Sequence, residues 1–442
     1  MIDSKFKIDI PKYPRVIIET LNNNGFEAYI VGGCVRDILL GEKPTDYDIT
    51  TNAKPQDIKK IFKKTIDTGI KHGTVTVLFY ENDVPKTYEV TTYRIDGDYK
   101  DGRHPEEVYY VNNLKEDLKR RDFTINAMAY NDDVGLVDEF GGVTDLKNKI
   151  INTVGSPYER FEEDALRLLR AIRFAAKLDF SIDKKTREAI PLLASNLRLI
   201  SKERIQVELT KTLISKRPEY IGEAFNLGLA KYICDGFENI KTGKFDKFLP
   251  VHIAYACLLY NENEESAYKI LKELKLSNNV ISNVILLLKG KALYKDLEHI
   301  INESKKVEIA NLKVHFLGKE SYVATEFEIL IKKLIDLLKY DLIYDFIRLI
   351  EINEENKKLI SDLKKKVDYF KEINIPIFTK DIDVDGKSLI DIGYKGEMVG
   401  FAINKIKEII HKYPEFNEKK LLQEVLKKAY NIYVGRENFY EL

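Results

Sequence analysis

The chain has few cysteines, and its three are widely spaced along 442 residues. Cys34, Cys234 and Cys257 are an odd set without the close pairs of a zinc site, so neither a disulfide framework nor a zinc centre is predicted. Long apolar runs are also lacking, because none reaches the ~20 residues that a membrane span requires. Residues 1–16 carry acids and no apolar run, unlike a secretory signal. These absences predict a cytoplasmic protein with reduced thiols and no membrane partner.

An excess of charge of one sign is absent as well, since 71 basic side chains balance 71 acidic ones. Phosphate binding requires clustered lysine and arginine, so this balance alone disfavours a nucleic-acid protein. Short basic runs do occur at 59–64, 119–121 and 363–366. Each such run is more often a solvated helix face than a binding patch. Charge therefore leaves the class of partner open.

Glycine and proline become sparse after Gly155, and this change of texture divides the chain. The preceding part holds short β-type runs at 26–33, 74–80, 87–94 and 108–111, with helix-like stretches such as 55–64 between them. This mixture predicts an α+β domain built on a small mixed sheet over residues 1–155.

The rest of the chain predicts helices almost throughout, because apolar residues recur at helical spacing. The expected helices are 159–177, 184–195, 201–216, 218–228, 265–275, 278–289, 325–351, 398–412 and 417–429. The length exceeds what one core supports, so three further all-α units are predicted at 156–220, 221–350 and 351–442.

Residues 30–50, IVGGCVRDILLGEKPTDYDIT, hold the first candidate site. Glycines let a backbone approach a ligand closely, and a helix N-terminus attracts anions, so Gly33 and Arg36 predict a phosphate-binding turn. Asp46 and Asp48 would share one face of a strand. Two such carboxylates suit Mg²⁺ and phosphoryl transfer. The alternative is that both aspartates are solvated acids in a loop. The glycine pair upstream favours the metal site over this alternative. Glu89 is a possible third carboxylate on a neighbouring strand.

RRDFTINAMA, residues 120–129, places two arginines and an acid ahead of an apolar run. Arg120 or Arg121 could grip a triphosphate, and Asp122 could bind a ribose hydroxyl. The alternative is a helix start with Asp122 near its N-cap, and the two interpretations are compatible.

EDALRLLRAIRF, residues 163–174, threads charges through an apolar helix. Residues three apart are neighbours on a helix, so Asp164, Arg167, Arg170 and Arg173 are expected to form one stripe. An Asp164–Arg167 salt bridge is the plain interpretation. The functional one is that an obligate acceptor beside an obligate donor fits cytosine and adenine, which carry an amino group where uracil and guanine carry a carbonyl.

Five segments in order resemble the five motifs of class II tRNA nucleotidyltransferases, the family of CCA-adding enzymes and bacterial poly(A) polymerases. They are GGCVRDILLGEKPTDYDIT, RRDFTINAMA, DEFGGVTDL, EDALRLLRAIRF and ISKERIQVEL. They lie in about the first half of the chain, and residues 378–400 resemble the family's tail region more weakly.

The resemblance implies a polymerase-β-like head at 1–155, a neck at 156–220, a body at 221–350 and a tail at 351–442. It implies that CTP and ATP are the substrates, that tRNA is bound at its acceptor stem and elbow, and that DNA is not a partner. The implied site residues are Gly33 and Arg36 in the triphosphate turn, Asp46 and Asp48 as catalytic Mg²⁺ ligands, Arg121 on the nucleotide, Asp164 and Arg167 as the protein template, Arg170 and Arg173 in the pocket, and a supporting helix from Ser201. Asp122 is a further nucleotide-binding candidate from its own position in the sequence.

Several alternatives stay open. The enzyme could add only A or only CC, and the seemingly full-length loop at 96–105 favours A addition. A poly(A) polymerase is disfavoured, because 214–225 lacks the extra basic stretch. A non-catalytic RNA-binding protein would not need an intact Asp-Tyr-Asp, and a nucleotide sensor would not need the helical half. No phosphohydrolase activity is expected, since 249–265 lacks a His-Asp pair.

Overall fold

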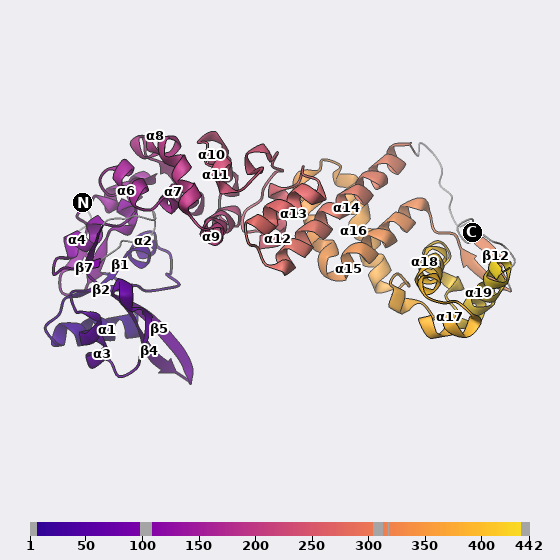
Figure 1. Ribbon diagram of the computed structural model, residues 1–442, viewed down its shortest axis with the longest axis horizontal. Coiled ribbons are helices and arrows are strands. Elements are labelled where there is room, and N and C mark those ends of the chain that lie inside the picture. Colours follow the sequence, from indigo (N-terminus) through magenta and orange to yellow (C-terminus); the bar gives the residue numbers. More distant parts are fainter. Residues whose placement is uncertain (1–6, 98–107, 304–312, 317, 435–442) are drawn as a thin grey trace. The chain divides into compact units, whose positions relative to one another are not determined.

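The computed structural model describes residues 7–97, 108–303, 313–316 and 318–434. Its contacts divide the chain into two compact units. Unit 1 comprises residues 1–240, 246–251 and 269–276, and unit 2 comprises 241–245, 252–268 and 277–442. Figure 1 shows unit 1 in indigo to magenta and most of unit 2 in orange to yellow. The head and neck predicted from the sequence both fall in unit 1, so the four-domain division stays a prediction.

A seven-stranded mixed sheet forms the centre of the predicted head, as expected for an α+β domain. In spatial order the strands are β3 (Thr65–Gly69), β4 (Thr74–Glu81), β5 (Val84–Thr92), β2 (Ile49–Thr51), β1 (Ala28–Val31), β8 (Ala129–Asn131) and β9 (Gly135–Val137). Only the pair of β2 and β5 is parallel, with Ile49 opposite Val90. All four residues of β1 are buried, because the strand lies inside the sheet with α1 packed against it.

Helices surround this sheet and then continue alone. Those within residues 7–240 are α1 (Lys12–Asn23), α2 (Gly33–Leu39), α3 (Pro55–Ile61), η1 (Ile70–His72), α4 (Leu114–Lys119), η2 (Thr124–Asn126), α5 (Gly142–Asn148), α6 (Pro157–Glu163), α7 (Leu166–Leu178), α8 (Lys184–Leu193), η3 (Ala194–Leu199), α9 (Lys202–Leu213), η4 (Pro218–Tyr220), α10 (Ile221–Asn226), α11 (Ala230–Ile233) and η5 (Phe237–Asn239). Two small ladders complete this part, β6 (Arg94–Asp96) with β7 (Val108–Tyr110) and β10 (Ile150–Ile151) with β11 (Ser181–Ile182).

The prediction of a single helix at 159–177 is wrong, because the helix is interrupted between α6 and α7. Asp164 sits at the break with φ −142° and ψ 102°, an extended conformation. Apolar spacing continues through the break, so periodicity could not reveal it. α7 packs against α9, and these two helices carry five charged side chains of the candidate site: Arg167, Arg170, Arg173, Arg204 and Glu208.

Helices also dominate the described residues after 240. They are α12 (Val251–Leu258), α13 (Glu264–Glu273), α14 (Asn278–Glu303), α15 (Glu326–Asn353), α16 (Lys357–Glu372), η6 (Thr379–Asp381), α17 (Gly386–Ile392), α18 (Glu397–Lys412), η7 (Pro414–Phe416) and α19 (Lys419–Val434). The hairpin of β12 (Lys313–Phe316) and β13 (Lys319–Tyr322) departs from the all-α prediction. A second departure is Lys339, whose φ of 56° breaks α15.

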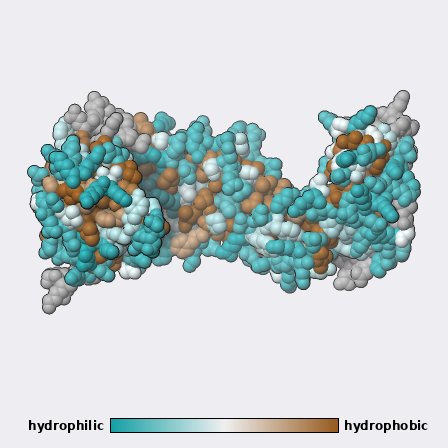
Figure 2. All heavy atoms as spheres, turned by 90° about the horizontal axis from the view of Figure 1, so that it is seen from below, coloured by the Kyte–Doolittle hydropathy of each residue, from teal (hydrophilic) through white to brown (hydrophobic). Residues whose placement is uncertain are grey.

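Hydrophilic residues cover much of the face shown in Figure 2, and hydrophobic residues lie among them in patches. Across the described ranges, no helix combines the length and the apolar character that crossing a bilayer would require.

Two adjacent glycines of the head serve different purposes. Gly141 has φ +78°, a conformation that favours glycine, whereas Gly142 is required for space. A Cβ on Gly142 would overlap the carbonyl oxygen of Thr124 and come within 3.0 Å of Met128 Sδ. The backbone of α5 can therefore press directly against η2, which carries part of the candidate site.

Gly142→Ala is expected to lower the free energy of unfolding by about 1–3 kcal/mol, because the added methyl group overpacks this contact. Denaturant unfolding monitored by circular dichroism measures the change. Gly222→Ala is the matched control, since a Cβ there would meet nothing within 4 Å. Alanine in the α10 helix should be neutral or stabilise by up to about 1 kcal/mol. Equal effects of the two substitutions would contradict the steric explanation.

Candidate active site

The turn between β1 and α2 lies where the sequence predicted a phosphate site. Gly32 has φ 79°, and a Cβ there would lie 3.0 Å from Arg121 Nη1. The absence of a side chain thus lets Arg121 reach the turn. Arg36 is near Gly33, as expected, but only 4% of it is exposed. Its guanidinium pairs with Asp37 at 2.6 Å, so its charge is already compensated inside the protein.

Asp46 and Asp48 precede the sheet rather than lying in it. β2 begins only at Ile49, so the expectation that both acids lie on a strand is wrong. The backbone still anchors them, because the carbonyl of Asp48 accepts from Val31 N–H at 3.0 Å. Continuing the parallel register of β2 and β5 by one residue sets Asp48 beside Glu89.

These carboxylates influence one another electrostatically. Loss of hydration raises the pKa of Asp48, and the charge of Asp46 raises it further, although Arg121 opposes the shift. Partial burial and the charges of both aspartates likewise raise the pKa of Glu89. None of the three forms an ion pair with another described residue. Negative charge that no ion pair neutralises fits a bound cation.

The described residues contain no ready group of three or more His, Cys, Asp or Glu side chains arranged around an ion. A Mg²⁺ ion requires only one or two carboxylates, with water and substrate phosphates completing its shell, so this finding does not bear on the acidic pair. It leaves Glu89 as a neighbour of Asp46 and Asp48 whose role as a ligand is untested.

Asp117, on α4, holds the two arginines of the RRDFTINAMA segment, and sequence reasoning missed it. Its carboxylate is fully buried and receives Arg120 Nε at 3.0 Å, Arg121 Nη2 at 3.3 Å and Thr50 Oγ1 at 3.1 Å. Burial alone would raise the pKa of Asp117, but the charges of Arg120 and Arg121 outweigh it and lower that pKa. Arg121 Nε is buried without a partner. Arg121 therefore has an unused donor within the described residues, while its Nη1 approaches the β1–α2 turn and its charge acts on Asp48.

Asp122 lies deep in the protein and is fully engaged. It accepts from Phe123 N at 2.8 Å, from Asn126 Nδ2 at 3.1 Å and from Arg170 Nε at 2.8 Å. Burial favours a raised pKa for Asp122, yet the charge of Arg170 and these hydrogen bonds hold it far below the ordinary value. Phe123, one residue later, is the N-cap of η2. The observed role of Asp122 is thus to fix Arg170.

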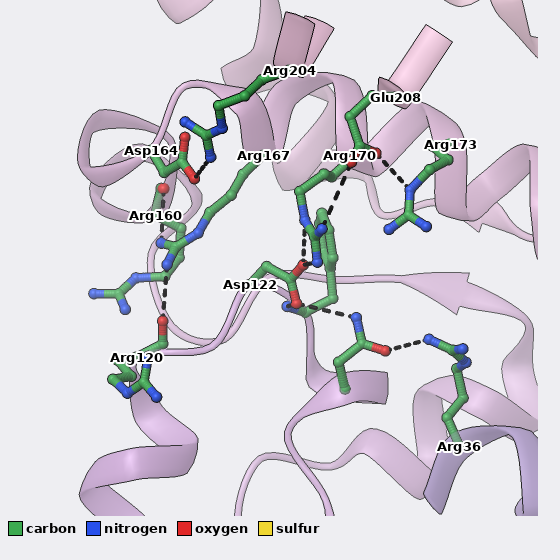
Figure 3. A network of polar contacts seen from close by, with 12 residues as sticks. Arg36, Arg120, Asp122, Arg160, Asp164, Arg167, Arg170, Arg173, Arg204 and Glu208 are labelled. Atoms are coloured by element: carbon green, nitrogen blue, oxygen red, sulfur yellow. Dashed lines mark hydrogen bonds and ion pairs between the residues drawn. The ribbon is translucent and has the colours of Figure 1, made fainter. Parts of the chain in front are cut away.

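Figure 3 shows that this pair belongs to a longer network of polar contacts. On one side Asn126 Oδ1 accepts from Arg36 at 2.5 Å. On the other side Glu208 of α9 lies 3.8 Å from Arg170 and 2.6 Å from Arg173. The network therefore connects the β1–α2 turn with α7 and α9.

Glu208 partly compensates the buried charge of Arg173. Burial lowers the pKa of Arg173 to about 10, although Glu208 opposes this shift. Arg173 also lies over the ring of Phe174, with 3.8 Å between the guanidinium carbon and the ring centroid. Arg170 and Arg36 contact the same ring at 5.3 Å and 5.2 Å. One aromatic ring and a few acids thus accommodate three buried or partly buried guanidinium groups.

The expected stripe of Asp164 and three arginines is wrong in its first member. Asp164 lies outside α7, and its carboxylate accepts from Leu166 N at 3.0 Å and from Arg204 Nη2 at 2.9 Å. Arg167 instead pairs with Glu163 at 2.5 Å. Its other nitrogen donates to the carbonyl of Arg120 at 2.9 Å. Arg167, Arg170 and Arg173 do share α7. Because Asp164 pairs with Arg204 and Arg167 pairs with Glu163, the plain Asp164–Arg167 salt bridge is not formed.

Arg204, Glu208, Asn126 and Asp117 are the site residues that sequence reasoning missed. Arg204 and Glu208 are four apart in ISKERIQVEL, which places them on one face of α9. That spacing is the sequence feature from which Arg204 and Glu208 could have been identified. Most of the loop at 96–105, which bears on A addition, lies outside the described residues.

Glu208→Gln is expected to lower the free energy of unfolding by about 3–5 kcal/mol, because it leaves the charge of Arg173 buried without its partner. Thermal and denaturant unfolding measure the effect. Glu223→Gln is the matched control: it breaks a 2.7 Å pair with Arg187, whose side chain is 48% exposed. That change should cost no more than about 1 kcal/mol. If both variants lose the same small amount, the α7–α9 charges do not stabilise the fold.

Family models match two parts of the chain. One described as the poly A polymerase head domain matches residues 28–152. One described as a probable RNA and SrmB-binding site of polymerase A matches residues 179–240. The first contains the turn and the acidic pair, and the second contains α9.

Known proteins resemble the chain over nearly its whole length. The CCA-adding enzyme of Ligilactobacillus salivarius is 37% identical over 431 residues, which cover 97% of each chain. That of Enterococcus faecalis is 43% identical over 305 residues, covering 65% of this chain and 71% of its own. A solved CCA-adding enzyme of Bacillus stearothermophilus, in complex with CTP, superposes with a TM-score of 0.73 at 27% identity, covering 96% of this chain and all of that one. The chain belongs to the family of CCA-adding enzymes.

Proposed function

We propose that this protein adds the sequence CCA to the 3′ end of tRNA from CTP and ATP, without a nucleic-acid template. The observation that carries the proposal is the acidic pair Asp46 and Asp48 beside the glycine turn approached by Arg121. It occurs in a chain that matches a CCA-adding enzyme over 97% of both lengths. In the reaction, the 3′ hydroxyl of the tRNA attacks the α-phosphate of the nucleotide, and pyrophosphate leaves.

The family uses a divalent metal, and we assign Mg²⁺ to Asp46 and Asp48. A bound Mg²⁺ supplies Lewis-acid stabilisation of the charge on the reacting phosphates. The residues of the chain then have distinct tasks. Gly33 begins α2 at the turn that we propose to meet the triphosphate, and Arg121 Nη1 approaches the same turn beside Gly32. Arg36, Asp122, Arg170 and Arg173 hold the walls of the nucleotide pocket through their network.

Asp164 and Arg167 are the proposed protein template. An ionised aspartate accepts hydrogen bonds only, and an arginine donates only. Their combination suits the amino group and ring nitrogen of cytosine and adenine, and it opposes the carbonyl oxygen of uracil and guanine. For Arg167 to reach a base, it must give up at least one of its bonds to the carbonyls of Arg160 and Arg120.

Unit 2 would hold the tRNA, at its acceptor stem and elbow, through shape and phosphate contacts rather than base sequence. A cytoplasmic location follows from tRNA as the substrate and stays a proposal. An A-adding or CC-adding specialist remains the alternative within the same family. A poly(A) polymerase and a non-catalytic RNA-binding protein are further alternatives.

Extension of three tRNA transcripts tests the function directly. The transcripts end at the discriminator base, after CC and after CCA, and each is incubated with Mg²⁺ and with labelled CTP, ATP or both. Complete CCA on the first transcript and no addition to the third is the expected result. Only A on the second or only CC on the first would show a specialist. Long A tails would show a poly(A) polymerase, and no incorporation would contradict catalysis.

Asp46→Asn and Asp48→Asn are expected to lower the rate of incorporation at least about a hundredfold, because each removes a charged metal ligand. A chelator should abolish the wild-type activity, and added Mg²⁺ should restore it. Asp83→Asn, at the exposed β4–β5 turn, is the control and should stay fully active. Near-normal rates in both site variants would refute the metal assignment.

Asp164→Ala should weaken selection between nucleotides more than it weakens triphosphate binding, since it removes the acceptor that meets the base. The measurement compares kcat/KM for CTP and ATP with that for UTP and GTP. A variant that keeps full discrimination against UTP and GTP would exclude Asp164 from the template.

A further inference from the structure

Asp164 depends on very few contacts for its position. It lies in the break between α6 and α7, where the weak 3.5 Å bond from its N–H to the Arg160 carbonyl replaces ordinary helical support. One carboxylate oxygen accepts from Leu166 N–H, and the other accepts from Arg204. Both side chains of the ion pair are largely buried, with 17% of Asp164 and 23% of Arg204 exposed. Arg204 is therefore the side chain that holds the second oxygen.

Arg204 comes from a helix that is itself firmly held. One turn further along α9, Glu208 forms ion pairs with Arg170 and Arg173 of α7. α9 is thus fixed against α7 at one turn and fixes Asp164 at the preceding turn. Figure 3 shows Arg204 approaching Asp164, whereas Arg167 points toward Arg120. Among the described residues, Asp164 is the ion-pair partner of this guanidinium, and the Nη1 of Arg204 is buried without a hydrogen-bond partner.

A fixed acceptor is required to reject a wrong base. Discrimination depends on the repulsion between the carboxylate and the carbonyl oxygen of uracil or guanine. A carboxylate that is free to rotate could turn away from that oxygen, and the wrong base would then be tolerated. Cytosine and adenine lose less from such freedom, because their amino group can follow an acceptor in several orientations. Rigidity thus matters more for exclusion than for binding.

We propose that Arg204 is a specificity-determining positioning residue, which clamps Asp164 so that UTP and GTP are excluded. This inference rests on the proposed function, and in particular on Asp164 as the acceptor for the base. Arg204 acts through Asp164 and does not contact the reacting phosphates.

The test uses the full-length protein and single-nucleotide incorporation on a tRNA transcript. Arg204→Met keeps the length of the side chain and removes its donors. Its ratio of kcat/KM for CTP over UTP should fall between about fivefold and about a hundredfold, the range of one bidentate contact. The same fall is expected for ATP over GTP on a transcript ending in CC. Most of the change should come from faster use of UTP and GTP. Arg204→Lys should be intermediate, because its shorter ammonium group can still donate to Asp164 but lacks the fixed planar geometry of the guanidinium.

Arg187→Met is the matched control, since it removes an arginine from an exposed ion pair with Glu223 on the same unit. Its nucleotide ratios should equal those of the wild type. In the background of Asp164→Ala, Arg204→Met should change the ratios no further.

The outcomes separate the two proposals. If the wild type adds no CCA, the proposed function fails first. If it does, and Arg204→Met or Arg204→Lys keeps the wild-type ratios, the clamp is wrong. An equal loss of activity with all four nucleotides would also overturn it, because that pattern indicates a purely structural role. If Arg204→Met does not fold, as judged by circular dichroism, Arg204→Lys alone decides by the same ratios.

Discussion

The ion pair of Asp122 with Arg170 is the contact on which the candidate site depends. A buried carboxylate is costly unless it is paired and hydrogen-bonded, and Asp122 satisfies both conditions. The pair joins the segment after α4 to α7. Through Asn126 it reaches Arg36 in the β1–α2 turn, and through Glu208 it reaches α9. This network thus connects the turn proposed to bind the phosphates with α7 and α9, the helices that also carry Arg167 and Arg204. The arginines of α7 are tolerated in an apolar helix because these partners and the ring of Phe174 receive them.

Much of the fold could be predicted from local patterns. The alternating run at 74–80 became β4, and the run at 87–94 became most of β5, because strand periodicity depends on neighbouring residues. The break at Asp164 could not be predicted in this way, since the apolar spacing runs through it. Its cause includes a partner 40 residues away, Arg204. The hairpin of β12 and β13 was missed for a different reason, because the β13 sequence KESY lacks the run of β-branched and aromatic residues that marks a strand.

The candidate site was predicted in its members more than in its contacts. The sequence identified Asp46 and Asp48 by type and spacing, yet it could not show that they precede β2. It also identified Asp122, Asp164 and the arginines, but it could not pair them. Pairing depends on which helices pack together, and the packing of α7 on α9 is a tertiary property. Arg204 and Glu208 acquire their significance only from that packing.

The break between α6 and α7 also separates two adjacent acids. Glu163 ends one helix and pairs with Arg167 at 2.5 Å, whereas Asp164 pairs with Arg204 at 2.9 Å. Neighbours in sequence with the same charge thus serve arginines from different helices, and each needs its own side-chain length. Exchanging the order of Glu163 and Asp164 would preserve composition, net charge and hydropathy. It would also place both carboxylates at the wrong distance from their arginine partners. The order of two like charges is therefore structural information in this protein, which any description by composition alone discards.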